Sequence, residues 1–394
     1  MKPALFIECT HTYRHGRKTG IQRVVRNILR QAPDAAAALG LPVVPLVFDG
    51  DRACFIDAAA VLDGTPPPPI GPAGRIGRKL RRMSGYGASA LDAYGAGSVL
   101  LLLDAAWDLP LWPAVRRVRA RGGRVASVIY DLIPLTHPDS AFGDLPAIFR
   151  RWLEAQAEIS EAFLCISAAT ATELTRFMAA AGQHPPITHF RLGSELDLVR
   201  PDDDIRPEFR AMFAADRPHF LLVGSIEPRK RHDFALDAFE LYWHQGGTGA
   251  LVVLGREDWR SEALLERIAR HPELNQRLFL VRDAGDAALD HAYRQATALI
   301  MTSNAEGFGL PIVEAFQRGL PVLCSDIPVF REVGGAGAGF FDVDDPADLA
   351  RLLSMPPVPA APGQWITWRE SAAELLNALA AALDLEKSAS PHNT

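Results

Sequence analysis

The stretch Met301–Leu323, MTSNAEGFGLPIVEAFQRGLPVL, most constrains how this chain folds. The apolar residues 297–301 predict a buried strand, and the apolar run opened by Pro311 predicts a helix, since proline is tolerated in the first helical turn. Gly307 and Gly309 stand in the loop between them. A glycine-rich loop between strand and helix points backbone N–H groups and the positive end of the helix dipole at an anion. The stretch therefore predicts an anion-binding loop of an α/β sheet.

Two glutamates, Glu306 and Glu314, stand in this stretch with seven residues between them. Carboxylates accept hydrogen bonds from hydroxyl groups, so a ligand with both phosphate and hydroxyls, such as a nucleotide sugar, fits the pattern. A lone glutamate in a helix is usually a surface residue. Glu314, however, lies in the apolar run IVEAF, where an unpaired charge would be costly. The pair therefore favours a functional site.

A second loop, SIEPRKRHD, follows an apolar strand predicted at 219–223 and precedes a helix predicted at 234–244. It places Arg229 and Lys230 at a strand end. Arginine binds phosphate oxygens through paired hydrogen bonds, and lysine supplies a compact charge. Such cations would hold a diphosphate whose negative charge grows while a bond to it breaks. The loop therefore predicts a diphosphate site.

Together, these motifs resemble the donor-site signature of retaining GT-B glycosyltransferases of family 4. The elements that carry the resemblance are the E-P-R-K loop, Glu-x7-Glu with its internal GFGLP, Gly319, Pro321-Val322 and Glu332-Val333-Gly334. The resemblance covers essentially the whole chain. It implies an α/β protein with two Rossmann-like doubly wound domains facing a central cleft, and a C-terminal helix that crosses back to the first domain.

The resemblance also implies the reaction and the roles of residues. A sugar would move from a nucleotide diphosphate to an acceptor hydroxyl by same-face attack, with the departing phosphate accepting the proton and no enzymic nucleophile. Arg229 and Lys230 would hold the diphosphate, Glu306 the hydroxyls of the transferred sugar, and Glu314 the ribose. Relatives often carry Arg where Ser225 stands, so Arg229 is the candidate for the second phosphate contact. Further expected donor contacts are Ser225, Val281, Asp283, Gly307, Phe308, Gly309 and Leu310.

Two segments of the first half are expected near the cleft. Residues 10–20 form a predicted loop before a helix at 21–31, and Gly20 would let the backbone approach the donor phosphate or the acceptor; a solvated loop is the alternative. Tyr130 and Asp131 follow a strand predicted at 124–129, where α/β sheets bind ligands. Relatives often have His-Asp there. Tyr130 replaces the His, and a pKa near ~10 makes tyrosine a poor base at neutral pH.

A length of 394 residues exceeds one ordinary core and predicts two domains. We expect an acceptor-side domain at 1–200, a linker at 201–217, a donor domain at 218–364 and a crossover helix at 365–387. Residues 64–97 are poor in apolar periodicity and are expected to be a mobile insertion. Their basic cluster, 75–83, suits a membrane leaflet or an anionic lipid-linked acceptor, or is a charged solvated loop.

The charge balance and the cysteine content limit which partners and which kinds of site we expect. Residues 1–200 carry 23 Lys and Arg against 18 Asp and Glu, a balance of +5, and the remainder carries −11. The basic half fits phosphates or an anionic membrane surface, and uneven decoration of solvated faces is the alternative. No apolar run could cross a bilayer, so we expect a cytoplasmic protein with peripheral contact at the inner face of the cell membrane. Free thiols are favoured over a metal site, because the chain has no C-x-x-C pair, and the cysteines are Cys9, Cys54, Cys165 and Cys324.

We expect no metal, no cofactor and no nucleic-acid partner. The E-P-R-K style of loop resembles bacterial mannosyltransferases for surface polysaccharides, which implies GDP-mannose as donor, with UDP- or dTDP-sugars as alternatives. A non-catalytic GT-B protein that binds a nucleotide sugar as scaffold or regulator competes with the transferase; the intact Arg229-Lys230 and the glutamate pair argue against it. A Rossmann dehydrogenase is disfavoured by the missing G-x-G-x-x-G, and a sugar phosphorylase by the missing pyridoxal phosphate site.

Overall fold

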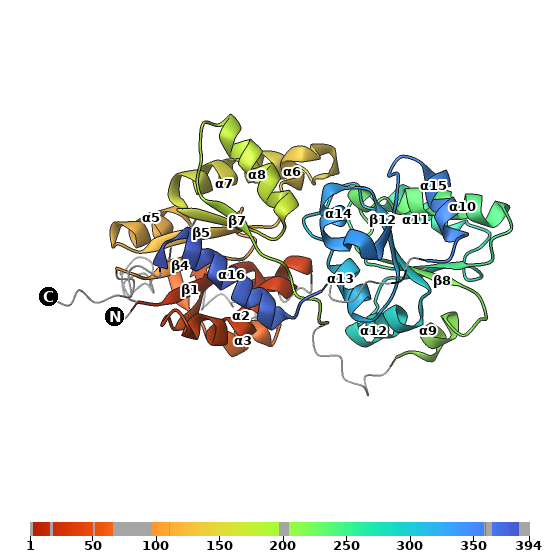
Figure 1. Cartoon of the computed structure of the whole chain (residues 1–394), viewed down its shortest axis with the longest axis horizontal. Coiled ribbons are helices and arrows are strands. Elements are labelled where there is room, and N and C mark those ends of the chain that lie inside the picture. Colours follow the sequence, from red (N-terminus) through yellow and green to blue (C-terminus); the bar gives the residue numbers. More distant parts are fainter. Residues whose placement is uncertain are drawn as a thin grey trace, which may run out of the picture. The chain divides into compact units, whose positions relative to one another are not determined.

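The computed structural model describes residues 3–15, 19–49, 52–65, 96–109, 111–196, 205–357, 359 and 365–385. The basic cluster 75–83 lies outside these ranges. The chain divides into two compact units (Figure 1). Unit 1 comprises Met1–Tyr130, Ala147–Arg191 and Trp368–Thr394, and unit 2 comprises Asp131–Pro146 and Leu192–Thr367.

Over the described residues, unit 1 forms a seven-stranded sheet in the order β3-β2-β1-β4-β5-β6-β7. Neighbouring strands are parallel except β2 and β3. The order reverses beside β1, which pairs with β2 and β4, and ligands of doubly wound sheets bind at such a switch point. The strands are β1 Leu5–Glu8, β2 Val43–Asp49, β3 Arg52–Phe55, β4 Val99–Leu102, β5 Arg124–Ile129, β6 Ala162–Cys165 and β7 Ile187–His189.

Helices cover both faces of this sheet: α7 and α8 lie over one face, and α2 and α16 over the other (Figure 1). The last helix, α16, packs against α2, β6 and β7. Its Ser371 hydroxyl donates to the Arg191 carbonyl at 2.6 Å, and its Glu374 accepts from the Arg191 backbone N–H at 3.0 Å. The helices are α1 Thr10–His15, α2 Gly20–Ala37, α3 Ala58–Leu62, α5 Trp112–Ala120, α7 Leu145–Ile159, α8 Ala168–Ala180 and α16 Trp368–Ala382.

Unit 2 forms, over its described residues, a six-stranded parallel sheet in the order β10-β9-β8-β11-β12-β13. Here β8 pairs with β9 and β11, so the switch point lies beside β8. The strands are β8 His219–Val223, β9 Ala250–Leu254, β10 Leu278–Val281, β11 Ala298–Met301, β12 Val322–Ser325 and β13 Ala338–Phe341. The helices are α6 Ile133–Thr136, α9 Pro207–Met212, α10 His232–His244, α11 Glu262–Ala269, α12 Asp286–Gln295, α13 Leu310–Gln317, α14 Pro328–Gly334 and α15 Pro346–Leu353.

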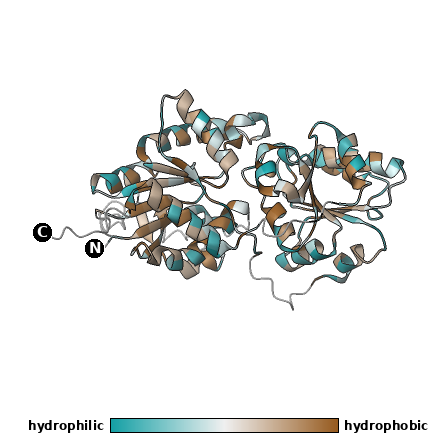
Figure 2. Cartoon of the chain, in the orientation of Figure 1, coloured by the Kyte–Doolittle hydropathy of each residue, from teal (hydrophilic) through white to brown (hydrophobic). Residues whose placement is uncertain are grey.

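The strands are continuous apolar runs because helices bury both faces of a parallel sheet. Every residue of β9, ALVVL, is buried. In Figure 2 the hydrophobic colour concentrates on the strands and on the inner faces of the helices. Where α10 packs on β8, the rings of Phe220, Phe239 and Tyr242 meet edge to face with centroids 5.6 to 6.1 Å apart. Burying each such ring contributes about 1.5–3 kcal/mol.

The structure differs from the sequence prediction just after β1. Residues 10–20 were expected to be a loop, but Thr10–His15 forms helix α1. The free N–H groups of its first turn find acceptors in two carboxylates: Glu8 accepts from Thr10 at 2.7 Å, and Asp104 accepts from Thr12 at 2.6 Å. Asp104 is 92 residues from Thr12 in the chain, so no local pattern could reveal this helix.

Those carboxyls form a buried pair at the switch point of unit 1. Glu8 is fully buried and Asp104 is 4% exposed. The Asp104 N–H donates to Glu8 at 3.3 Å. Burial, and after it the Asp104 charge, raises the pKa of Glu8 to about 8, and burial also raises the pKa of Asp104. A proton on Glu8 lets the two groups share an apolar site.

The raised pKa predicts a pH dependence of stability. A carboxyl whose folded pKa exceeds its unfolded value of 4.5 contributes stability that is fully present below that value and is lost as pH rises through about 8. Between these limits we expect the free energy of unfolding to fall by at most about 1.4 kcal/mol per pH unit. In Glu8→Gln the free energy of unfolding should depend less steeply on pH. Urea unfolding measured at several pH values between 4.5 and about 8 tests this. Glu154→Gln, at an exposed site on α7, is the control; equal slopes in wild type and Glu8→Gln would contradict the account.

None of the described helices is long and apolar enough to cross a bilayer. Within the same ranges, no group of three or more His, Cys, Asp and Glu side chains is arranged to hold a metal ion. Cys9, Cys165 and Cys324 are buried free thiols, and Cys54 is an exposed one.

Candidate functional site

The two motif loops of unit 2 meet at the carboxyl ends of β8 and β11, which are neighbouring strands. The E-P-R-K loop contains a short 3-10 turn, Pro228–Lys230. Hydrogen bonds join it to the loop after β11: the Thr302 hydroxyl donates to the Lys230 carbonyl at 2.7 Å, and the Asn304 N–H donates to the Arg229 carbonyl at 3.0 Å. The two loops therefore form one structural element.

An ionic cluster fills this junction. Arg229 bridges two carboxylates, with Nη2 2.8 Å from Glu227 Oε1 and Nη1 2.9 Å from Glu306 Oε2. The other oxygen of Glu306, Oε1, is bonded by Lys230 Nζ and by the Ser303 hydroxyl, the latter at 2.9 Å. One carboxylate thus holds Arg229 and Lys230 side by side, with both cations at the end of β8.

Burial and the two cations act on Glu306 in opposite directions. Burial alone would raise its pKa, but Arg229 and Lys230 outweigh burial and hold the pKa at about 2. Burial likewise disfavours the charged Arg229, yet Glu306, Glu227 and Asp131 raise its pKa overall. The side chains of Arg229, Lys230 and Glu306 are 20%, 12% and 10% exposed, so only a small part of each charged side chain reaches solvent. Glu306 and Arg229 are therefore held in their charged forms and are partly shielded from water, which strengthens the field between them.

Asp131 joins this cluster from the segment Asp131–Pro146 of unit 2. Burial raises its pKa, and the nearby Arg229 offsets this in part. Its Oδ1 accepts from the Ile133 N–H at 3.0 Å, which fixes the carboxyl at the start of α6. The preceding residue, Tyr130, belongs to unit 1 and is buried; its hydroxyl donates to the Leu103 carbonyl at 2.7 Å. Burial raises the pKa of Tyr130 well above the usual range, which argues against a role as a base.

Close backbone approach shapes the two loops. A Cβ added at Gly255, just after β9, would lie 1.8 Å from the carbonyl oxygen of Gly224, so only glycine fits there. Gly309 precedes α13 with φ +100°, a conformation that favours glycine, and a Cβ there would lie 2.9 Å from Phe330. Gly255 thus lets the ends of β8 and β9 approach closely, and Gly309 lets the chain turn directly into α13.

Glu314 lies inside the unit, on α13, and is only 2% exposed. The hydroxyl of Tyr293, on α12, donates to its Oε2 at 2.6 Å. The Arg318 guanidinium stacks over the Tyr293 ring at 5.5 Å and pairs with Asp290 at 2.7 Å. The apolar sequence around Glu314 thus reflects real burial, and its carboxylate is held by a hydrogen bond.

The other predicted site residues fall in four places. Gly307, Phe308, Gly309 and Leu310 run from the loop after β11 into α13. Val281 ends β10, and Asp283 follows in an exposed loop with its Oδ1 2.7 Å from Arg206 Nη2. Ser225 donates to Glu227 Oε1 at 2.7 Å. Gly20 is the first residue of α2 in unit 1.

Sequence reasoning assigned no role to three members of this region. Glu227 is the first residue of the E-P-R-K motif, and its carboxylate could have been predicted to pair with Arg229. Ser303 lies three residues before Glu306, a separation at which a side-chain contact could be suspected. Tyr293 carries no local signal, because it meets Glu314 through the packing of α12 against the loop and helix that follow.

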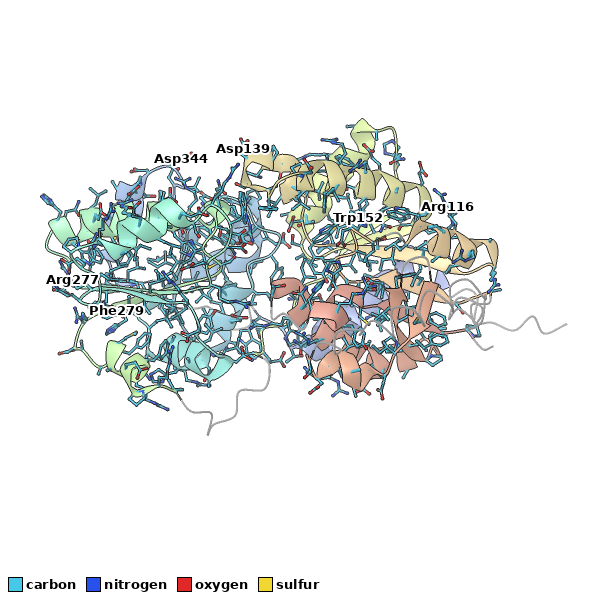
Figure 3. The ribbon with its side chains drawn as sticks, turned by 180° about the vertical axis from the view of Figure 1, so that it is seen from behind. Arg116, Asp139, Trp152, Arg277, Phe279 and Asp344 are labelled. Atoms are coloured by element: carbon cyan, nitrogen blue, oxygen red, sulfur yellow. The ribbon has the colours of Figure 1, made fainter. Side chains whose placement is uncertain are left out.

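Two cavities border the edge strand β10. One, of about 840 Å³, lies at its amino end and is lined by Arg277 and Phe279, which Figure 3 labels. The other, of about 530 Å³, lies between α9, α11 and the carboxyl end of the strand and includes Val281 and Asp283. Only the second adjoins residues predicted to contact the donor.

Comparison with known proteins agrees with this geometry. Residues 205–354 match the family model described as glycosyl transferases group 1. The serotype-specific mannosyltransferase WbdA of Escherichia coli is 32% identical over 397 residues, which are 95% of this chain and 46% of WbdA. O-antigen chain mannosyltransferase B of Escherichia coli is 26% identical over 230 residues, 57% of this chain and 58% of that protein. The chain spans about half the length of the curated relatives it matches.

Comparison with solved structures identifies the fold of this chain. The Anabaena protein HepE, crystallised in complex with UDP, has a TM-score of 0.58 at 14% identity, with 98% of this chain and 99% of HepE covered. Sucrose-phosphate synthase of Thermosynechococcus elongatus has a TM-score of 0.57 at 17% identity, with 98% of each chain covered. The prediction of a GT-B fold is confirmed. Residues 205–354 thus form a group 1 glycosyltransferase domain, in a chain with the GT-B fold that is homologous to O-antigen mannosyltransferases.

Proposed function

We propose that this protein is a retaining glycosyltransferase of bacterial surface polysaccharide synthesis. It moves mannose from GDP-mannose to a hydroxyl of a glycan or lipid-linked acceptor. The observation that carries the proposal is the ionic cluster in which Glu306 holds Arg229 and Lys230 side by side at the end of β8. The choice of sugar and pathway is supported by two relatives, a serotype-specific mannosyltransferase and an O-antigen chain mannosyltransferase.

The cluster suits the departure of a nucleoside diphosphate. As the bond from the sugar carbon to the phosphate oxygen breaks, negative charge accumulates on the diphosphate. Arg229, Lys230 and the positive end of the α13 dipole would be fixed in advance where that charge develops, so they would stabilise the transition state without reorganisation. The acceptor oxygen bonds to the sugar carbon from the same face, and its proton passes to the departing phosphate. No enzymic nucleophile and no metal enter this scheme.

The carboxylates would select the donor. The pKa of Glu306 is about 2, so its carboxylate is ionised at physiological pH and can accept hydrogen bonds from sugar hydroxyls. Glu314 would take the ribose hydroxyls, with Tyr293 fixing its orientation. The base would lie near Val281 and Asp283, beside the cavity of about 530 Å³. Asp131 contributes a further carboxyl next to Arg229. We place the enzyme in the cytoplasm, in peripheral contact with the inner face of the cell membrane.

A thermal-shift panel with GDP-, UDP-, dTDP- and ADP-sugars, without added metal, tests the donor site. A ligand at one hundred times its dissociation constant stabilises the protein by about 2.7 kcal/mol. We expect GDP-mannose to give the largest shift with wild type. Glu314→Gln should bind it about tenfold more weakly, because a hydrogen bond to a charged acceptor is worth about 1.5–3 kcal/mol.

Tyr293→Phe is the matched control, because it removes the partner of Glu314 and keeps the carboxylate. Its GDP-mannose shift should stay within about threefold of wild type in affinity. If none of the nucleotide sugars stabilises wild type, the donor site is wrong. If GDP-mannose binds but no mannose is transferred to any glycan or lipid-linked acceptor, the non-catalytic scaffold is the better description.

A further inference from the structure

Helix α5 of unit 1 has an unusual charge pattern. The segment 112–124, WPAVRRVRARGGR, contains five arginines and no acidic residue. The helix turns its small apolar residues inward, with Ala114, Val115 and Val118 buried against the sheet. The exposed side is therefore basic, and its arginines are Arg116, Arg117, Arg119 and Arg121. Solvated helices ordinarily mix charges of both signs, so this face differs from common surface decoration.

The exposed residues of α5 form an ordered stripe. Trp112, Arg116 and Arg119 are spaced i, i+4 and i+7, which places them along one side of an α-helix. Trp112 packs partly against the hydrophobic core of unit 1 and is partly exposed. Figure 3 shows Arg116 at the periphery of its unit, whereas Trp152 of α7 lies inside it. The stripe thus combines an aromatic ring at its start with two exposed arginines.

Contacts within the described residues provide a partner for only one of the two arginines of this stripe. Arg116 makes no ion pair or hydrogen bond with any other residue in the described ranges, and the Arg119 guanidinium donates to a backbone carbonyl, that of Glu158, at 3.1 Å. Arg124 differs, because it pairs with Glu161 at 2.9 Å. Like charges three residues apart, such as Arg116 and Arg119, destabilise a helix slightly. No contact within the described residues accounts for the Arg116 charge, and an external anionic surface would account for both arginines.

We propose that the outer face of α5, comprising Trp112, Arg116, Arg117 and Arg119, docks on an anionic lipid bilayer. The choice of lipid rests on the proposed function, in which the acceptor is lipid-linked. It is also favoured by the stripe itself. Guanidinium groups bind lipid phosphates through paired hydrogen bonds, and an indole ring at the edge of the stripe suits the level of the headgroups. Docking would hold the enzyme where its acceptor is anchored.

Co-sedimentation with lipid vesicles tests this surface. Wild type should bind vesicles of phosphatidylcholine with phosphatidylglycerol, and it should not bind phosphatidylcholine alone. Loss of one arginine near an anionic surface weakens partitioning by about fivefold, so R116Q/R119Q should bind about 25-fold more weakly. R116K/R119K keeps the charge and should bind within about threefold of wild type. R270Q/R351Q removes the same charge from exposed sites of unit 2 and should bind as wild type does.

Several results would overturn the proposal. One is equal binding of wild type and R116Q/R119Q to the anionic vesicles. Another is equal loss of binding in R270Q/R351Q, which would reduce the effect to net charge. A third is α5-dependent binding of wild type to heparin without binding to the vesicles, which would assign the surface to a soluble polyanion. The GDP-mannose thermal shift of R116Q/R119Q should equal that of wild type. The thermal shift tests the proposed donor site and vesicle binding tests the proposed lipid surface, so the two proposals can fail independently.

Discussion

Replacing Lys230 by alanine is expected to lower kcat by about 10²–10³-fold. The Lys230 ammonium lies against Glu306, and its methylene carbons lie 3.5–3.6 Å from the position that a Cβ on Gly224 would take. Its charge is therefore held in place before the donor arrives. Because the charge of the diphosphate increases as the bond breaks, losing this cation should raise the transition state more than the bound ground state. Initial rates at varied donor concentration should show a large fall in kcat and a smaller change in KM.

Arg231→Asn is the matched control for this result. It removes the neighbouring cation, whose guanidinium lies 3.7 Å from Asp233 and stacks over the Phe234 ring at 5.4 Å. Arg231 has φ +50°, and asparagine tolerates this left-handed conformation better than most residues. We expect kcat of Arg231→Asn to remain within about tenfold of wild type. If both variants lose activity equally, a general loss of positive charge explains the effect and the specific role of Lys230 is wrong.

Replacing Gly255 by alanine is expected to lower the free energy of unfolding by at least about 3 kcal/mol. The new Cβ would stand 1.8 Å from the Gly224 carbonyl oxygen, which is backbone and cannot rotate away. The strand ends must separate instead, although hydrogen bonds join the Gly224 N–H to Leu254 and the Gly255 N–H to Val281, both at 3.0 Å. The E-P-R-K loop begins at this point, so transfer activity should fall as well.

Urea unfolding measures the first effect, and Gly285→Ala provides the comparison. Gly285 precedes α12 with φ −77°, and no atom lies within 4 Å of an added Cβ. We expect this variant to lose no more than about 1 kcal/mol. Equal destabilisation by the two substitutions would mean that the contact between Gly255 and Gly224 is not what constrains the backbone there.

Several elements were predictable because their signal is local. The strands predicted at 124–129 and 219–223 are β5 and β8 with the same bounds, since both are apolar runs that helices cover on each side. The two motif loops follow β8 and β11, and the pairing of these strands brings Arg229, Lys230 and Glu306 together. A strand–loop–helix pattern therefore indicates both the sheet and the edge at which its ligand site lies.

Other features depend on contacts that sequence spacing does not reveal. Helix α10 was predicted to begin at Phe234 but begins at His232, because Arg231 adopts the left-handed conformation just before it. Helix α1 depends on Asp104, and the orientation of Glu314 depends on Tyr293. The linker predicted at 201–217 contains helix α9. Each case involves a partner or a backbone conformation set by tertiary packing, which is why propensity alone did not predict it.

The path of the chain between the two units limits how this protein can be divided. The chain changes unit after Tyr130, Pro146, Arg191 and Thr367. A fragment cut at 205–354 keeps the group 1 domain but loses Asp131, and a fragment that ends at Arg191 loses α16 from the packing of unit 1. Neither half is therefore a continuous cassette. Exchange of the donor half between relatives, in the laboratory or by recombination, has to carry at least two separate stretches of sequence to preserve both the ionic cluster and the first unit's core.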